Sequence, residues 1–110
     1  MNTQHRELAS GRWKQLSFFE QMANIGSEVE RALNWQAKHN VEYCKQASNR
    51  ALELIELSLD NFTSYSRIKE VARLREAIVD YFYETNQFMS TEASWRKYFL
   101  AFAYAARRTS

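Results

Sequence analysis

The sequence contains no proline, two glycines and a single cysteine in its 110 residues. One cysteine cannot form a disulfide within the chain, and zinc sites that need several thiolates are excluded. Cys44 falls on the apolar side of its expected helix, where we expect a buried thiol. Because the proline- and glycine-rich turns of a β-sandwich are also missing, the composition predicts an all-α fold.

The length and composition of the chain suit a single domain. Its net charge does not indicate a particular class of binding partner. The 45% hydrophobic content supports a single core. The formal net charge is only +2, although Arg outnumbers Lys by ten to five, which suits forked contacts to carboxylate or phosphate as well as solvated helix faces. No apolar stretch follows the basic residues near the N-terminus, so the cytoplasm is the expected location.

The stretch from Leu16 to Gln36 carries the clearest helix signals. Ser17 and Glu20 have the spacing of a capping box, which predicts a helix start at this point. Gly26 lies beside the apolar stripe and predicts a close crossing with another helix, because it has no Cβ. The stripe itself follows alternating steps of four and three residues through Phe18, Met22, Ile25, Val29, Ala32 and Gln36.

Three more helical segments follow, each bounded by turn or capping residues such as Asn40 and Thr91. Short connections between helices of similar length predict an antiparallel up-down-up-down four-helix bundle. The N-terminal residues form a polar lead-in, loose or partly helical, with Trp13 packed against the bundle end. The lead-in spans residues 1–15, and the bundle spans residues 16–110. The four helices of the bundle are expected at about 17–38, 41–59, 65–84 and 91–108.

The last expected helix is apolar on every side over residues 98–106. It is too short to cross a bilayer, which takes about 20 residues, so no membrane association is expected. A helix without a polar side must be covered, and a second copy of the chain is the predicted cover. A homodimer or other homo-oligomer is therefore expected, with Tyr98, Leu100, Ala101 and Tyr104 as candidates for self-association.

Arg75 interrupts the apolar stripe of the third expected helix, between Val71 and Ile78. A buried guanidinium requires a partner, because an uncompensated charge in a core is costly. One hypothesis is a structural ion pair with Glu30, and the other is an anionic ligand bound by Arg75 in a gap of the bundle. Asp80, by contrast, is placed on the outer side of the same helix.

A second unusual set of residues lies on the first expected helix and points away from its apolar stripe. It contains Trp35, which is exposed there unless the lead-in folds over it. Because Trp and Arg are frequent in binding hot spots, the same row is a candidate surface for a protein partner. The row consists of Asn24, Glu28, Arg31 and Trp35.

Catalytic and metal-binding motifs are missing from the sequence. It contains no Glu-x-x-His pair for a di-iron site, no phosphate-binding glycine loop and no Gly-x-Ser-x-Gly elbow. The only histidines are His5 and His39, so no metal site and no cofactor are predicted. An enzyme that uses carboxylates such as Glu30 and Asp80 in a cavity is the remaining catalytic hypothesis.

Most of the chain resembles a group of small, uncharacterised bacterial and archaeal all-helical proteins of similar length. The resemblance is carried by residues 20–32, 50–54, 75–83 and 95–107. It implies a stand-alone prokaryotic protein and indicates no activity.

A second resemblance concerns the HEPN class of helical bundles, many of which act on RNA or accompany small nucleotidyltransferases. Their ribonuclease signature is an Arg followed after four to six residues by His, whereas seven residues separate Arg31 from His39 here. Because this spacing differs from the ribonuclease signature, the resemblance to the HEPN class implies only a similar fold. In this alternative the chain is a nucleic-acid- or nucleotide-binding bundle associated with a nucleotidyltransferase or toxin-antitoxin system. The positive charge for contacts with phosphate would come from Arg67, Arg73, Arg75, Arg107 and Arg108. No sequence motif supports nucleic-acid binding.

The leading prediction is a protein without catalytic activity. We expect an interaction or regulatory module that self-associates through its last helix and binds a protein partner.

Overall fold

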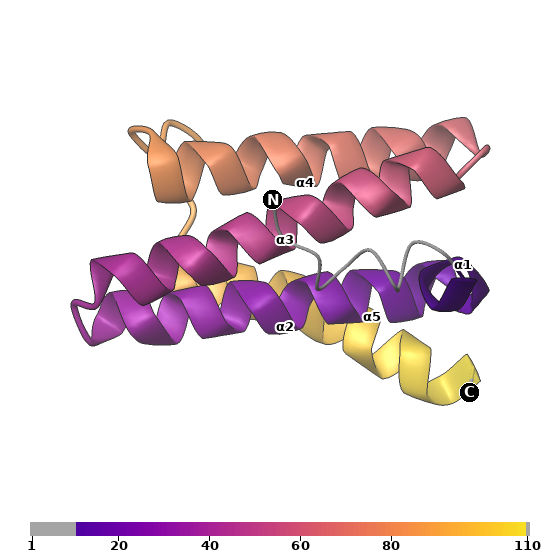
Figure 1. The fold of residues 1–110 in the computed structure, drawn as a ribbon, viewed down its shortest axis with the longest axis horizontal. Coiled ribbons are helices and arrows are strands. Elements are labelled where there is room, and N and C mark those ends of the chain that lie inside the picture. The colour runs from indigo at the N-terminus through magenta and orange to yellow at the C-terminus, as the bar shows by residue number, and fades with distance from the viewer. Residues whose placement is uncertain (1–10, 110) are drawn as a thin grey trace.

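The computed structural model describes residues 11–109, with side chains to residue 108, and this part of the chain is all-helical without strands. The all-α prediction is therefore confirmed. Five helices follow one another over the described residues (Figure 1): α1 (Trp13–Gln15), α2 (Phe18–Ala37), α3 (Val41–Asn61), α4 (Tyr65–Tyr83) and α5 (Glu92–Thr109).

Local capping explains where the long helices begin. The Ser17 side chain accepts a hydrogen bond from the Glu20 backbone N–H at 3.1 Å, and the Glu20 carboxylate accepts one from the Ser17 N–H at 2.8 Å. This is the predicted capping box, which satisfies two donors that a helix start leaves unpaired. The Asn40 side chain likewise accepts from the Tyr43 N–H at 3.0 Å at the start of α3. Both starts therefore follow from short-range sequence.

Helices α2 and α3 form the middle of the structure, between α5 and α4. Helix α2 packs against α3 on one side and α5 on another, while α4 packs on α3 (Figure 1). Gln21, near the start of α2, bonds Ser58, near the end of α3, so these two helices run in opposite directions. The C-terminal part of α5 diverges from α2 in Figure 1.

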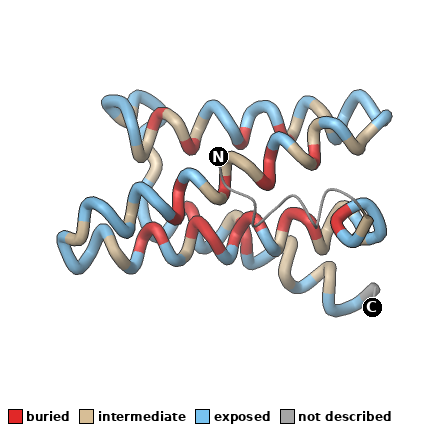
Figure 2. Tube along the Cα trace, viewed as in Figure 1, coloured by how far each residue is buried: buried red, intermediate tan, exposed pale blue. Residues whose placement is uncertain are grey.

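The core is the apolar side of α2 together with the sides of its neighbours that face it (Figure 2). Four residues of the predicted α2 stripe, Met22, Ile25, Val29 and Ala32, are completely buried, whereas Gln36 at its end is exposed. The other helices supply the remaining core residues: Ala51, Leu54 and Ile55 from α3, Val71, Leu74 and Ile78 from α4, and Trp95 and Phe99 from α5.

Trp13 connects α1 to the adjoining ends of α2 and α3. It is buried, as predicted, and its indole N–H donates to Ser58 Oγ at 3.3 Å. Ser58 donates in turn to Gln21 Oε1 at 2.8 Å, and the Gln21 amide donates to the backbone oxygens of Trp13 and Leu16. Buried polar groups need hydrogen-bond partners. In this chain of hydrogen bonds, the buried side-chain groups of Trp13, Ser58 and Gln21 all have partners. The rest of the predicted lead-in, residues 1–10, lies outside the described residues.

Asp80 organises the loop between α4 and α5. Its carboxylate is buried and accepts hydrogen bonds from the backbone N–H groups of Gln87 at 2.7 Å and Phe88 at 3.0 Å. The prediction that Asp80 faces outward is therefore wrong, because the loop folds back over the end of α4. Within this loop Asn86 and Met89 have φ values of 57° and 58°, in the left-handed region.

Candidate interaction surface

Arg75 is exposed, and the prediction that it is buried in the apolar stripe is wrong. Its side chain is 47% exposed, and its Nε donates to Glu56 of α3 at 2.9 Å. The buried stripe of α4 runs through Val71, Leu74 and Ile78. Leu74 therefore faces the core where Arg75 was predicted to lie. Helix α4 packs mainly against α3. Arg75 therefore lies at the exposed edge of the contact between α3 and α4.

Glu30 pairs with Arg96 of α5 and not with Arg75. Arg96 Nε lies 3.0 Å from Glu30 Oε1, and its Nη1 lies 3.0 Å from Glu92 Oε1. The hydrogen bond to Glu30 is the largest cause of the raised pKa of Arg96. Both partners are about half exposed, so this pair links α2 to α5 at the surface and adds little stability by itself.

The predicted exposed row on α2 does not form a uniform surface. Asn24 and Arg31 are exposed, but Glu28 is only 8% exposed, so its outward placement is wrong. Arg31 donates to Glu28 Oε2 at 2.9 Å. Trp35 is half-buried because the Tyr43 ring of α3 packs edge-on against it, with ring centroids 4.8 Å apart. Residues 11–15 lie at the opposite end of α2 and do not cover Trp35 (Figure 1).

Three of the four self-association candidates on α5 face solvent. Leu100 is 64% exposed and Tyr104 is 55% exposed, and Ala101 is exposed as well. Tyr98 is half-buried and faces α4, where its hydroxyl donates to the Glu70 carboxylate. Burial and this hydrogen bond raise the pKa of Tyr98 well above its ordinary value. Tyr98 therefore belongs to the contact between α4 and α5.

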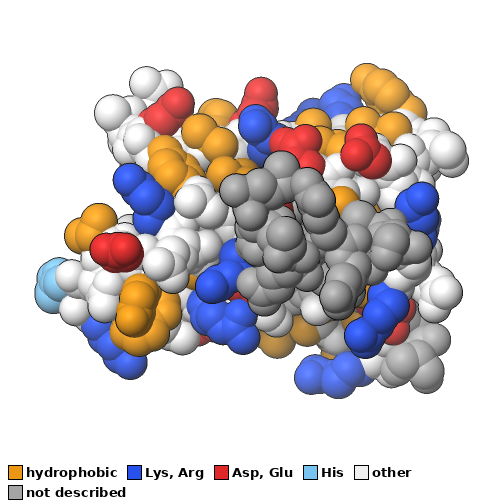
Figure 3. All heavy atoms as spheres, in the orientation of Figure 1, with side chains coloured by type: hydrophobic (Ala, Val, Ile, Leu, Met, Phe, Trp, Pro, Cys, Tyr) orange, Lys and Arg blue, Asp and Glu red, His pale blue; other side chains and the backbone are white. Residues whose placement is uncertain are grey.

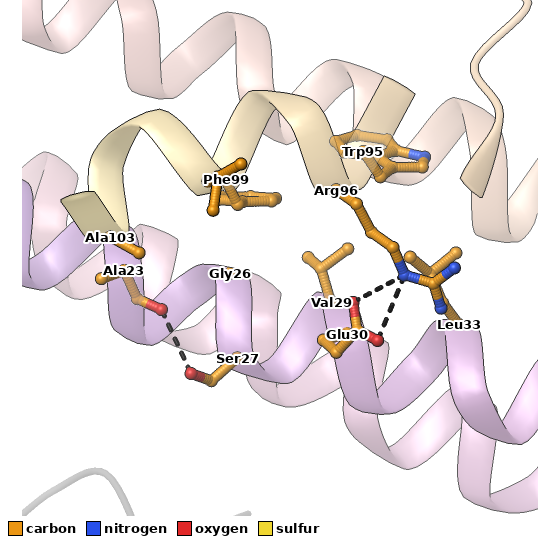
Figure 4. A pocket seen from close by; sticks show the side chains of 11 residues that line it. Ala23, Gly26, Ser27, Val29, Glu30, Leu33, Trp95, Arg96, Phe99 and Ala103 are labelled. Carbon is orange, nitrogen blue, oxygen red and sulfur yellow. Dashed lines mark hydrogen bonds and ion pairs between the residues drawn. The ribbon is translucent and has the colours of Figure 1, made fainter. Parts of the chain in front are cut away.

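A hollow of about 400 Å³ lies between α2 and α5, next to the exposed α5 residues (Figure 4). We call it the α2–α5 groove. Three small residues line one part of its α2 side, and the Glu30–Arg96 pair lies at the other end (Figure 4). The residues that form its walls include Ala23, Gly26 and Ser27 from α2 and Phe99, Leu100 and Ala103 from α5.

Gly26 determines how closely α5 approaches α2. A Cβ atom at this position would lie 2.7 Å from the Phe99 ring atoms Cγ and Cδ1 and 2.9 Å from Phe99 Cβ. The predicted close helix crossing at Gly26 is confirmed, although the Phe99 side chain and not another backbone occupies the space. The spacing of Ala23, Gly26 and Ser27 on one side of α2 is the sequence signal for this groove.

The residues considered for chemistry do not converge. Glu30 is in the ion pair with Arg96, whereas Asp80 holds the α4–α5 loop. Cys44 is partly buried, and desolvation raises the pKa of its thiol. Within residues 11–109, no group of three or more His, Cys, Asp or Glu side chains is arranged to hold a metal ion.

The arginines proposed to supply a basic surface are distributed over two helices. Arg67 lies over the Phe18 ring at 4.9 Å, and Arg108 over the Tyr104 ring at 5.7 Å. On the face shown in Figure 3, described Lys and Arg side chains are interspersed with acidic, polar and apolar groups. None of the described helices has both the length and the apolar character of a membrane span.

Comparisons with known proteins add no assignment. No family model matches the chain, and no curated protein or solved structure matches it significantly.

Proposed function

We propose that the protein is a non-catalytic interaction module, an antiparallel up-down-up-down four-helix bundle formed by α2 to α5, which self-associates through α5. The observation that carries the proposal is a pair of large exposed side chains on α5: Leu100, which lines the α2–α5 groove, and Tyr104, one helical turn further along. An isolated exposed apolar residue is ordinary, but two on one helix next to an apolar hollow favour a contact surface.

A second copy of the chain fits this surface because the surface is self-complementary. It combines the exposed Leu100 and Tyr104 side chains with a hollow whose walls include the small residues Ala23, Gly26 and Ser27. In a two-fold dimer the same patch serves both subunits, so Leu100 and Tyr104 of one copy can enter the groove of the other. Removing such a side chain from water contributes about 1.5–3 kcal/mol. The four side chains of a dimer then provide a substantial part of the association free energy.

Sedimentation velocity over a range of concentrations tests the dimer. The parent chain should show a mass that rises towards the dimer, and Leu100→Gln should weaken association by about tenfold or more. Val41→Gln is the matched control, since Val41 is 76% exposed at the start of α3, away from the groove. Both variants should keep the parent melting temperature at concentrations where the parent is monomeric, because dimerisation itself raises the melting temperature. A parent chain that remains monomeric at its highest soluble concentration would overturn the proposal.

A further inference from the structure

A pocket of about 300 Å³ lies where the end of α4 meets the start of α3, and we call it the α3–α4 pocket. Tyr83 at the end of α4 bonds Ser48 near the start of α3, with 2.9 Å between the hydroxyl oxygens. Arg75, earlier on α4, bonds Glu56, later on α3, so these two helices run in opposite directions. The last turn of α4 therefore lies at the same end of the structure as the α2–α3 turn (Figure 1).

The more buried part of the pocket is apolar and held in place. Phe82 is half-buried and contributes a ring, and Cys44 contributes a half-buried thiol. The Tyr83 hydroxyl bonds Ser48 and donates to Asn49, which fixes the Tyr83 ring against α3 as a second wall. Fixed rings give a flat apolar ligand a preformed contact surface.

The outer part of the pocket carries hydrogen-bond donors and one cation. His39 and Lys45 lie there and are exposed, and none of the described residues that line the pocket is acidic. Lys45 forms no ion pair with a described residue, although Glu42 precedes it by three positions. An imidazole has at least one N–H donor in either protonation state. Donors and a cation without a lining carboxylate complement an anion.

The backbone of His39 supports a role for its side chain. His39 follows α2 directly after the Lys38 cap and has a φ of 59°, in the left-handed region. Helices often end on such a residue, which is usually glycine because a Cβ is unfavourable there. Strained backbone of this kind is concentrated at functional sites. The imidazole is thus retained at some cost in stability, at a position where it lines the pocket.

We propose that the α3–α4 pocket binds a small aromatic monocarboxylate of about the size of phenylacetate. The carboxylate accepts hydrogen bonds from the Lys45 ammonium group and a His39 ring N–H. The aromatic ring contacts Phe82, Tyr83 and Cys44. A volume of about 300 Å³ lies at the lower end of small-molecule pockets and suits a single ring. The inference does not depend on self-association, since none of the described lining residues belongs to α5.

Cys44 reports occupancy of the pocket, because it lines the pocket and is the only cysteine of the chain. The full-length protein is alkylated with the neutral reagent iodoacetamide, and mass spectrometry follows the rate while phenylacetate is titrated in. Phenylacetamide keeps the ring without the charge, and acetate keeps the carboxylate without the ring. Glutathione alkylated under the same conditions corrects for any effect of the ligands on the reagent. Isothermal titration calorimetry measures the same affinities directly.

We expect phenylacetate to slow Cys44 alkylation saturably and to bind about tenfold or more tightly than phenylacetamide or acetate. Lys45→Met should weaken phenylacetate binding by a similar factor. Lys38→Met is the matched control, because Lys38 lies over the Trp35 ring and does not line the pocket. His39→Gly should also weaken binding, whereas its melting temperature should stay equal or rise, because glycine relieves the left-handed backbone.

The possible contrary results separate the parts of the proposal. Without saturable protection of Cys44 by phenylacetate, the pocket is not a site for this ligand. Equal binding of phenylacetamide would contradict the carboxylate contact, and equal binding of acetate would contradict the ring contact. Undiminished binding by Lys45→Met or His39→Gly would refute the role given to that side chain.

Discussion

Replacing Gly26 with alanine tests the contact that sets the distance between α2 and α5. The new Cβ would lie 2.7 Å from Phe99 ring atoms and 2.9 Å from Phe99 Cβ, closer than packed carbon atoms come. Rotation of the ring cannot relieve the contact with Phe99 Cβ, because that atom is fixed to the α5 backbone. The substitution therefore forces α5 to move away from α2.

Two effects of opposite sign determine how much Gly26→Ala changes the free energy of unfolding. Alanine is favoured over glycine inside a helix by about 1 kcal/mol. Overpacking a core contact costs about 1–3 kcal/mol, and here the cost lies towards the upper end because backbone must shift. We expect Gly26→Ala to lower the free energy of unfolding by about 1–2 kcal/mol. For a domain of about this size, each kcal/mol corresponds to a decrease of about 4–8 °C in melting temperature.

Chemical and thermal denaturation followed by circular dichroism measure this change. Gly11→Ala is the control, since a Cβ at Gly11 meets no atom within 4 Å, and its stability should stay equal or rise slightly. Phe99→Ala removes Cγ and Cδ1, the two nearest atoms to the new Cβ, so it should cost less in the Gly26→Ala background than in the parent. A Gly26→Ala variant at least as stable as the parent, without this coupling, would refute the packing argument.

Three further predictions concern polar groups. Ser58→Ala should lower the free energy of unfolding by about 1–3 kcal/mol in urea denaturation, because it leaves buried partners in α1 and α2 unpaired. Asp80→Ala removes the acceptor for two loop N–H groups and should cost about 2–4 kcal/mol, with faster amide exchange at Gln87 as the local signature. The raised pKa of Tyr98, caused by burial and Glu70, means that the unfolded chain ionises first. Stability should therefore fall as pH rises above about 10, and melting curves of Tyr98→Phe should show a smaller loss.

The sequence was most informative where the interactions are short-range. The capping box at Ser17, the Asn40 cap and the buried stripe of α2 all follow from residues within a few positions of one another. The crossing at Gly26 could also be predicted, since a missing Cβ indicates a close approach even when the approaching group is unknown. The resemblances to uncharacterised prokaryotic proteins and to HEPN bundles stay predictions.

The same reasoning failed for α4. Its apolar residues extend around much of the helix, so the pattern allowed either Leu74 or Arg75 to face the core. A rotation of about one residue, 100° on a helix, separates the two choices. Packing against α3 selected Leu74 and left Arg75 beside Glu56. Asp80 was misplaced for a related reason, because its partners belong to a loop whose path no local pattern specifies.

The amino-acid order alone determined that the chain is helical, where the long helices begin and which side of α2 is buried, because backbone capping and apolar periodicity act within a few turns. Only the tertiary structure decided the partners of Glu30 and Asp80, the exposed side of α5 and the burial of the Trp95 N–H without a partner among the described residues. Those features depend on how each helix is rotated and spaced against its neighbours, and these long-range contacts have no signature in a single helix.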